Sequence, residues 1–449
     1  MRKYFSSYWI RSAFFSILQR FSLLIFGLTN FMVLIRELTK AEMGTWALFL
    51  TITTLFEATK SGLLKNAHIM YVSSSDDEHE KSIIASSSFI INLCISIFFI
   101  ILVLLFSNWL SVKLHAGVDL AVMLKWFIPG LICMIFFSHF EAIQQSFLDF
   151  KGVFAGYMVR QVVFFIIIII HLFIHKPFTL KDLAIYQSIS VVLGTVVLYI
   201  YTKKYMVHRF NAKRQWVNKI FSYGKYVFGS GLIINIFANF DQLMTATFMS
   251  SFYVSYYNVA LRINGFIDIP SYAAAQILFP KTAKASVEEG TQKVKYLYER
   301  IVGILLSFTT PIALFVIIFP KFVITIIAGA QYLAAVPILQ LYMILGLLRP
   351  MQNQAANTLN SIGKPQLCFK LDALGLLMNI GLNYICLTIF GFYGAAIGTF
   401  ITCSITTLIW YFIMKKEINL QLPNVGNHMI HSYKTVYAAA VNILTRKSA

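Results

Sequence analysis

The sequence has few charged residues and long stretches that contain none. Aspartate, glutamate, lysine and arginine make up 12% of its 449 residues, whereas hydrophobic residues make up 58%. This composition excludes a soluble globular protein, because recurring apolar runs of about 18 or more residues are typical of membrane-spanning helices. The sequence therefore predicts an all-α polytopic membrane protein.

Acidic residues are the scarcer kind of charge, at 18 against 37 lysines and arginines, and the formal net charge is +19. The basic residues lie mostly in short segments beside apolar runs, where membrane topology and anionic lipid headgroups account for them. The charge therefore predicts contact with a membrane and no nucleic-acid partner.

Cysteines number only five and are scattered in or beside apolar runs, so they predict neither a disulfide framework nor a CxxC metal site. The sequence also lacks a Walker A loop, a GxSxG or HExxH motif and a soluble stretch long enough for a catalytic domain. His171 and His175 have the spacing of two metal ligands, but two are too few for a site, and an interfacial role is favoured. We expect no cofactor, no metal and no enzymatic activity; chemistry by scattered membrane carboxylates is the alternative.

The apolar runs predict about twelve transmembrane helices. They cover residues 12–35, 44–67, 83–106, 122–148, 153–174, 183–202, 226–249, 253–279, 300–319, 334–360, 371–390 and 394–414. Lysine and arginine are concentrated in the connections after the sixth and eighth spans, so we expect both termini to be cytoplasmic.

A basic connection near the middle of the chain predicts two parallel six-helix halves. An offset of 211 residues, which places Glu57 on Asp268 (268 − 57 = 211), agrees with such a repeat. The expected parts are an amphipathic cytoplasmic lead-in at 1–11, a first half at 12–202, a basic connection at 203–225, a second half at 226–414 and a cytoplasmic tail at 415–449.

Charged and amide residues interrupt the span at 253–279. At 100° per residue, Asn258, Arg262, Asn264 and Asp268 fall in one sector roughly 160° wide. A charged side chain at mid-membrane costs about 2.5–3.5 kcal/mol on insertion scales, so such residues usually face a bundle interior or a wet cavity. This span therefore predicts one wall of a polar cavity.

Two earlier spans also carry charges. Glu57 and Lys60 share a face of the second span and can pair at i and i+3, so an ion pair that only holds helices together is an alternative. Arg20 lies inside the first span, where snorkelling to lipid headgroups is the alternative.

Further polar stripes occur on three other spans. Their members are Glu141 in the span 122–148, Asn235, Asn239 and Gln242 in the span 226–249, and Arg349, Asn353 and Asn357 in the span 334–360. Asp241 is turned about 120° away from the stripe of its span. Interhelical hydrogen bonds by asparagine could explain any one stripe. Together with the spans 44–67 and 253–279, five helices carry such stripes, and five together favour a shared polar cavity.

Several segments resemble a known family. They are RELTKAEMGTWALF at 36–49, SYYNVALRI at 255–263, ILFPK at 277–281, AGAQYLAAVPIL at 328–339, the segment LNSIGKPQ, and GFYGAAIGT at 391–399. With these pieces in this order, the sequence resembles the polysaccharide transporter family of the multidrug/oligosaccharidyl-lipid/polysaccharide exporter superfamily. That family includes flippases for O-antigen and capsule repeat units.

The resemblance implies a V-shaped bundle of two six-helix halves around a central polar cavity that opens by alternating access. It implies a flippase that moves a polyprenyl diphosphate-linked oligosaccharide from the cytoplasmic to the outer leaflet of the bacterial plasma membrane. In the related flippase for the lipid-linked peptidoglycan precursor, cationic residues on helices one, two and eight line the cavity. Here Arg20, Lys60 and Arg262 match by helix and depth. A polysaccharide polymerase and glycosyltransferases are the implied partners.

We assign the polar residues as follows. The diphosphate is expected at Arg20, Lys60, Arg262 and Arg349. The glycan is expected at Asn235, Asn239, Asn258, Asn264, Asn353 and Asn357. Counter-charge or ion coupling is expected at Glu57, Glu141, Asp241 and Asp268. The alternatives are a multidrug or organic-cation exporter of the same superfamily and a non-transporting scaffold of a glycan-assembly complex. The basic balance within the spans favours an anionic cargo.

Overall fold

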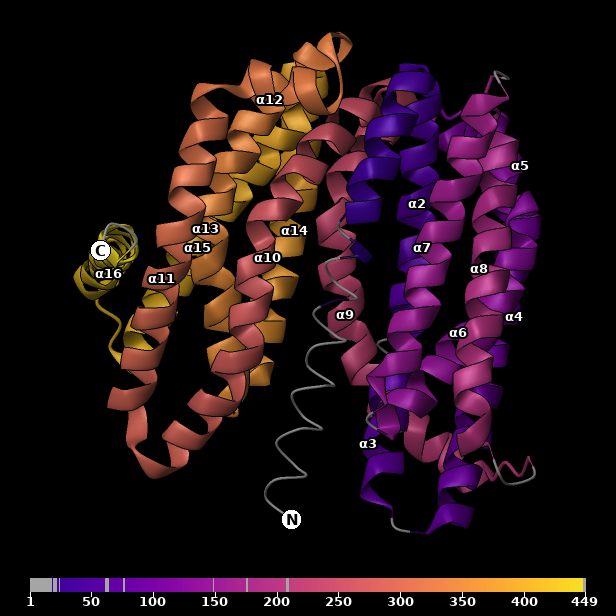
Figure 1. Ribbon diagram of the computed structural model, residues 1–449, viewed down its shortest axis with the longest axis horizontal. Coiled ribbons are helices and arrows are strands. Elements are labelled where there is room, and N and C mark those ends of the chain that lie inside the picture. Colours follow the sequence, from indigo (N-terminus) through magenta and orange to yellow (C-terminus); the bar gives the residue numbers. More distant parts are fainter. Residues whose placement is uncertain are drawn as a thin grey trace. The chain divides into compact units, whose positions relative to one another are not determined.

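A computed structural model of the chain describes residues 18, 22–23, 25–60, 64–75, 77–147, 149–174, 177–206 and 210–446. These residues are almost entirely helical, and no strand occurs among them. Residues 25–37 form a helix, and the helices that follow are labelled in Figure 1.

The labelled helices have these bounds: α2 (Lys40–Lys60), α3 (Asn66–Ser74), α4 (Glu78–Lys113), α5 (Asp119–Trp126), α6 (Ile128–Ser146), α7 (Phe150–Phe173), α8 (Leu180–Thr202), α9 (Arg214–Phe248), α10 (Ser251–Glu288), α11 (Gly290–Ile318), α12 (Pro320–Ile327), α13 (Val336–Ser361), α14 (Pro365–Phe390), α15 (Gly394–Ile418) and α16 (Leu422–Arg446). The short 3-10 helices are η2 (Lys203–Tyr205), η3 (Ala330–Ala335) and η4 (Gly391–Tyr393).

Each expected span overlaps a described helix. The first overlaps residues 25–37, the span 44–67 covers most of α2 and reaches the start of α3, and the span 122–148 corresponds to α5 and α6 with a 46° bend between them. The others each correspond to one helix. By length and composition, six of the described helical stretches could cross a membrane, or seven if the bent pair is one span; one stretch contains both α14 and α15. The prediction of an all-helical multi-pass membrane protein is confirmed.

The helices begin where local side chains satisfy their free N–H groups. The Asp77 carboxylate accepts a hydrogen bond from the N–H of His79 at 2.9 Å at the start of α4, and Thr179 Oγ1 accepts one from the N–H of Asp182 at 3.2 Å at the start of α8. Large apolar side chains on the outer face of α4, such as Phe98, Leu105 and Trp109, remain exposed, as expected for a surface that contacts lipid.

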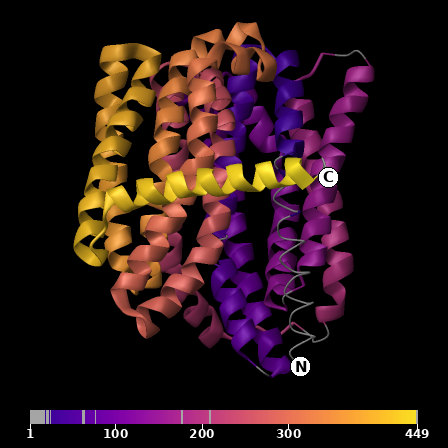
Figure 2. The same cartoon turned by 60° about the vertical axis from the view of Figure 1, so that its left-hand side comes forward.

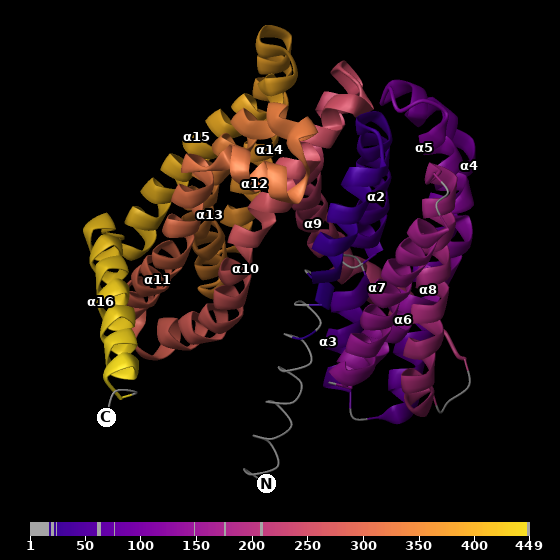
Figure 3. The ribbon, with the colours of Figure 1, turned by 45° about the horizontal axis from the view of Figure 1, so that its top comes forward.

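The chain forms two compact units. The first contains the residues up to Asn239 and Ala246–Ser255, and the second contains Phe240–Thr245 and the residues from Tyr256 onward. Within the first unit, α8 packs against both α6 and α7, and Figure 3 shows these three helices side by side. α9 contributes to both units, so the expected boundaries at 202 and 226 stay predictions.

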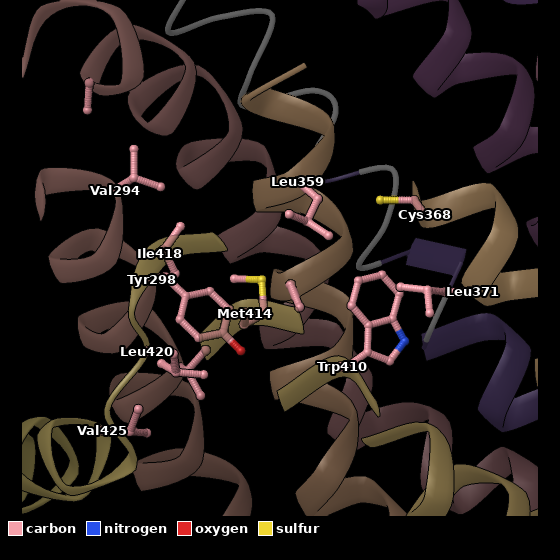
Figure 4. Packing of buried hydrophobic residues seen from close by; sticks show 13 residues of the cluster. Val294, Tyr298, Leu359, Cys368, Leu371, Trp410, Met414, Ile418, Leu420 and Val425 are labelled. Atoms are coloured by element: carbon pink, nitrogen blue, oxygen red, sulfur yellow. The ribbon is translucent and has the colours of Figure 1, made fainter. Parts of the chain in front are cut away.

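Within the second unit, α10 and α11 meet in a hairpin at Gly290, whose φ of 76° favours glycine (Figure 1). α14 and α15 pack along their length. Figure 4 shows the apolar core of this unit, where Tyr298 of α11 lies beside Met414 of α15 and the hydroxyl of Tyr298 donates to the carbonyl oxygen of Met351 at 3.0 Å.

α16 lies across α11 rather than along it (Figure 2). A Cβ at Gly303 would stand 2.6 Å from the Cβ of His428, so the absence of a side chain permits this crossing. Glu299 of α11 accepts hydrogen bonds from the N–H of Gln421 at 2.9 Å and from Asn424 Nδ2 at 3.0 Å. The tail beyond α15 is therefore a helix anchored to the second unit.

A polar cluster joins the connection between α6 and α7 to the end of α8. Asp149 Oδ2 accepts hydrogen bonds from Lys204 Nζ at 2.8 Å and from the hydroxyl of Tyr205 at 2.9 Å. Burial raises the pKa of the Asp149 carboxyl, but these hydrogen bonds outweigh burial and the net pKa lies below its ordinary value.

We expect Asp149→Asn to lower the thermal unfolding temperature slightly at neutral pH. A carboxyl whose pKa is lowered by folding stabilises the protein above its unfolded pKa of about 3.9, and this stabilisation is lost as the pH falls through the folded pKa. The effect is small because Lys204 is 57% exposed and solvent screens the pair. Unfolding of wild type and variant in detergent at several pH values checks this: a difference that persists at the lowest pH contradicts it.

Candidate functional site

The first unit contains a polar cavity of about 270 Å³ among its helices. Side chains from α2, α4, α6 and α7 line it, together with Lys65 just before α3. The polar lining residues are Thr54, Glu57, Lys65, Ser88, Asn92, Ser138, His139, Glu141, Tyr157 and Arg160. A cavity with this many donors and acceptors inside membrane-spanning helices can bind a hydroxyl-rich or charged group.

Two ion pairs line this cavity. Arg160 Nη2 of α7 donates to Glu57 Oε1 of α2 at 3.1 Å, and Lys65 Nζ donates to Glu141 Oε1 of α6 at 2.8 Å. The Tyr157 hydroxyl donates to the other oxygen of Glu141 at 3.3 Å. Among the described residues at the cavity, the charges of two cations and two carboxylates therefore cancel.

Two buried histidines lie beside this cavity. The rings of His68 and His139 meet edge to face, with centroids 5.8 Å apart. His68 is fully buried, and neither of its ring nitrogens has a hydrogen-bond partner among the described residues. Since buried polar atoms normally have a partner, His68 has unused capacity to bind a ligand.

The second unit contains an arginine–aspartate pair. Arg349 Nη1 of α13 donates to Asp268 Oδ2 of α10 at 2.6 Å. When the Asn264 amide is oriented for hydrogen bonding, its oxygen accepts a hydrogen bond from Arg349 Nη1 at 2.6 Å. Its nitrogen then donates one to the carbonyl oxygen of Tyr342 at 2.9 Å. Three residues predicted from the sequence therefore come together on two helices.

Asp241 lies in a separate buried cluster of the second unit. Its carboxylate accepts hydrogen bonds from the Tyr342 hydroxyl, from Asn383 Nδ2 at 2.8 Å and from Thr399 Oγ1 at 2.5 Å, and all four side chains are buried. No described basic side chain forms an ion pair with Asp241. The cluster thus holds a buried carboxylate among neutral hydroxyl and amide groups, so Asp241 stays a candidate for ion coupling.

Close contact between α14 and α15 positions this cluster. A Cβ at Gly398 would lie 2.3 Å from Asn383 Oδ1 and 2.8 Å from the Asn383 backbone nitrogen. A Cβ at Gly394 would lie 2.2 Å from the carbonyl oxygen of Cys386. The two glycines, four residues apart, let the helix backbones approach as in small-xxx-small packing in membranes.

The other predicted glycan residues are dispersed. Asn357 Nδ2 donates to the carbonyl oxygen of Ala275 at 3.0 Å, which is the interhelical role that was the alternative for it. Asn353 Nδ2 reaches Ser271 Oγ at 3.5 Å, and Asn258 is buried with its Oδ1 unpaired among the described residues. Asn239 is partly buried.

The structure describes only some of the predicted cationic side chains. Arg262 of α10 is exposed and Arg349 is engaged by Asp268. Arg20 and the lead-in at 1–11 lie outside the described residues, as do the side chains of Lys60 and Asn235. The expected pair of Glu57 with Lys60 therefore stays a prediction, and the structure adds Arg160 as a partner of Glu57.

Sequence reasoning missed several residues of these sites. Arg160 stands alone in the apolar run at 153–174, which is the same signal that identified Arg262. Asn379 and Asn383 are four residues apart in α14, and Thr399 ends the segment GFYGAAIGT. Among the described residues, no group of three or more His, Cys, Asp or Glu side chains could hold a metal ion. His171 instead stacks on Phe178 and hydrogen-bonds the Tyr186 hydroxyl at 2.8 Å.

Solved structures of low sequence identity share the fold of this protein. It is similar to an inward-facing multidrug resistance MATE family transporter of the MOP superfamily, with a TM-score of 0.80 over 89% of this chain and 94% of that one. It is also similar to the lipid II flippase MurJ, with a TM-score of 0.75 over 96% of this chain and 93% of that one. Identity is 16% in both cases, so these likenesses establish the fold of a helical polytopic membrane protein.

A family model described as polysaccharide biosynthesis protein matches residues 33–337, and the chain belongs to this family.

The chain is 21% identical to a membrane protein in the cps region of Klebsiella pneumoniae, over 97% of this chain and 87% of that protein. It is 26% identical to an uncharacterized membrane protein of Methanocaldococcus jannaschii over 57% of this chain and 50% of that protein. It is 20% identical to a probable low-salt glycan biosynthesis flippase of Haloferax volcanii over 45% of this chain and 43% of that protein. The chain thus spans about half the length of the archaeal relatives. The family inferred from the sequence is confirmed.

Proposed function

We propose that the chain is a flippase that moves a polyprenyl diphosphate-linked oligosaccharide from the cytoplasmic to the outer leaflet of the bacterial plasma membrane by alternating access. O-antigen, capsule or other polysaccharide repeat units are the class of cargo. The observation that carries the proposal is the polar cavity of the first unit, with ionised side chains inside membrane-spanning helices. The family and the flippase named among the relatives support it.

The physical need for such a cavity follows from the cargo. A diphosphate and a glycan cannot cross hydrocarbon unassisted, because their charges and hydroxyls would lose their hydrogen bonds. Arg20, Lys60, Arg262 and Arg349 would bind the diphosphate by charge-assisted hydrogen bonds, and Arg160 and Lys65 of the polar cavity join them as candidates.

The remaining polar residues would bind the glycan and balance the charge of the cations. Asn235, Asn239, Asn258, Asn264, Asn353 and Asn357 would bind sugar hydroxyls. Glu57, Glu141 and Asp268 hold the cations while the cargo is absent. Both termini are cytoplasmic in this proposal, and a polysaccharide polymerase and glycosyltransferases are the partners.

We expect Arg262→Ala to lower glycolipid transfer by about tenfold or more, because loss of one charge-assisted hydrogen bond to an anion is worth about 1.5–3 kcal/mol. The measurement is the amount of lipid-linked oligosaccharide on each leaflet in cells that carry the variant. Lys125→Gln, which removes an exposed basic side chain, is the control for charge alone. Transfer retained by Arg262→Ala together with loss of resistance to cationic drugs would favour an exporter.

We expect Asp241→Asn to abolish the dependence of transfer on an ion gradient while the protein still folds. The substitution keeps the shape of the side chain and its place among Asn383, Thr399 and Tyr342, but removes the charge that a proton or cation would neutralise. One charge moved across the membrane is worth about 2.3 kcal/mol per 100 mV, so this site could drive the cycle. Transfer measured in vesicles with imposed proton or sodium gradients checks this; unchanged gradient dependence in the variant contradicts it.

A further inference from the structure

A second cavity in the first unit adjoins the polar cavity. It has a volume of about 380 Å³ and lies between α3, α4, α6 and α8 at the end where the connection at 203–213 begins. We call it the aromatic pocket. Its aromatic wall consists of Phe89, Phe136, Phe140, Phe147, Tyr199, Tyr205 and Phe210. These rings contact one another along the pocket: the Phe89 and Phe136 centroids are 5.8 Å apart, and those of Phe140 and Tyr199 are 5.5 Å apart.

The two cavities meet at His139, which lines both of them. His68 lines the aromatic pocket and faces His139, and neither of its ring nitrogens has a partner in the part of the chain that the structure describes. Beside its aromatic wall, the pocket thus presents a buried imidazole whose nitrogens have no hydrogen-bond partner among the described residues. An apolar ligand alone would leave them unpaired, and a polar ligand alone would leave the aromatic wall uncovered.

Two lysines lie at or beside the pocket, and each pairs with a carboxylate. Lys81 lines the pocket and binds Glu78 at 2.6 Å, and exposed Lys204 follows α8 next to Tyr205. Two hydrogen bonds hold the 211–213 segment against α4. Ser86 Oγ accepts one from the N–H of Asn211 and Ser87 Oγ accepts one from the N–H of Lys213, each at 3.1 Å. Lys81 is paired with Glu78 and Lys204 with Asp149, so these groups are polar but carry no net charge.

The ligand that fits both cavities is an amphiphile with its polar group at the histidines. We propose that the aromatic pocket holds the first isoprene units of the cargo's lipid chain, with the diphosphate between the two histidines and the cations Arg160 and Lys65 of the polar cavity. Imidazole N–H groups donate to phosphate oxygens, and the polar cavity offers both donors and acceptors to a sugar. This inference rests on the proposed flippase function and names where the cargo enters the first unit.

Photocrosslinking tests the position of the chain directly. Phe89→p-benzoylphenylalanine places the probe in the pocket, and Leu105→p-benzoylphenylalanine places it on the same helix at a site that is 68% exposed. The purified variants are irradiated in vesicles of phosphatidylethanolamine and phosphatidylglycerol doped with undecaprenyl diphosphate. We expect isoprenoid adducts at residue 89 to exceed the isoprenoid share of the lipid by about tenfold, which corresponds to about 1.4 kcal/mol of preference. Adducts at residue 105 should follow bulk lipid. Equal adduct composition at the two positions overturns the inference.

A blocking variant tests the consequence for transport. Ala85 lines the pocket, so Ala85→Trp should fill it and lower glycolipid transfer by about tenfold, equal to about 1.4 kcal/mol. Leu105→Trp adds the same bulk to the outer face of α4 and should leave transfer unchanged. If wild type transfers the glycolipid but residue 89 captures only phospholipid, this inference is wrong and the flippase function stands. If wild type transfers no glycolipid, the flippase function is wrong, whatever residue 89 captures.

Discussion

The Arg349→Ala variant is expected to unfold at a markedly lower temperature than wild type. Removing one member of a buried ion pair typically costs about 3–5 kcal/mol, because the remaining charge is left without a partner in a medium of low dielectric. Here the remaining charge is Asp268, whose side chain is only 13% exposed, and Asn264 also loses its donor. Thermal unfolding of the purified protein in detergent measures the effect.

A double-mutant cycle separates lost pairing from other damage. Arg349→Ala combined with Asp268→Ala should recover part of the lost stability, since the unpaired carboxylate is gone. Arg349→Lys keeps the charge but loses the planar guanidinium, so its loss of stability should be smaller than that of Arg349→Ala. If the double variant is as unstable as the sum of the two single variants, the ion pair is not what stabilises the contact between α10 and α13.

The Gly398→Ala variant is expected to be destabilised by about 1–3 kcal/mol, the usual cost of overpacking a close contact. The added Cβ would lie 2.8 Å from the backbone nitrogen of Asn383, so α14 and α15 would have to separate. Asn383 binds Asp241, so the same movement should also disturb the ion coupling that is proposed for Asp241.

Gly381→Ala is the matched control for this effect. Gly381 lies on α14, and a Cβ there would meet nothing within 4 Å. Because alanine favours helix over glycine by up to about 1 kcal/mol, this variant should be as stable as wild type or more so. Equal loss of stability in the two variants would mean that the close approach of α14 and α15 is not the reason for glycine at position 398.

The helices could be predicted from the sequence because apolar runs report directly on burial in lipid. The polar residues of α10 and α13 could be identified too, since a charge inside such a run is conspicuous. Their partners could not: Asp268 and Arg349 are 81 residues apart, and only the packing of α10 on α13 brings them together. Asparagine was the least informative residue type, because Asn357 proves to hold two helices together whereas Asn258 keeps an unpaired oxygen.

The sequence contained signals for the residues that were missed, but their meaning depends on contacts between helices and cannot be read from one helix at a time. Arg160 appeared as one charge among many apolar neighbours, and its meaning depends on Glu57 reaching it from α2. The repeat offset of 211 residues places Glu57 on Asp268, and in each unit this carboxylate binds an arginine of another helix. The arginines lie on α7 and α13, and Arg160 and Arg349 are not related by this offset. The offset therefore indicated the two carboxylates but not the arginines that bind them.

The ion pairs also decide how the membrane potential acts on the protein. A cation and a carboxylate that move together carry no net charge through the electric field, so Arg160 with Glu57, Lys65 with Glu141, and Arg349 with Asp268 are electrically silent while each pair is closed. A step that separates the two members of a pair along the membrane normal would instead move charge through the field, at about 2.3 kcal/mol for one charge and each 100 mV crossed. Opening of these pairs would therefore make that step voltage-sensitive.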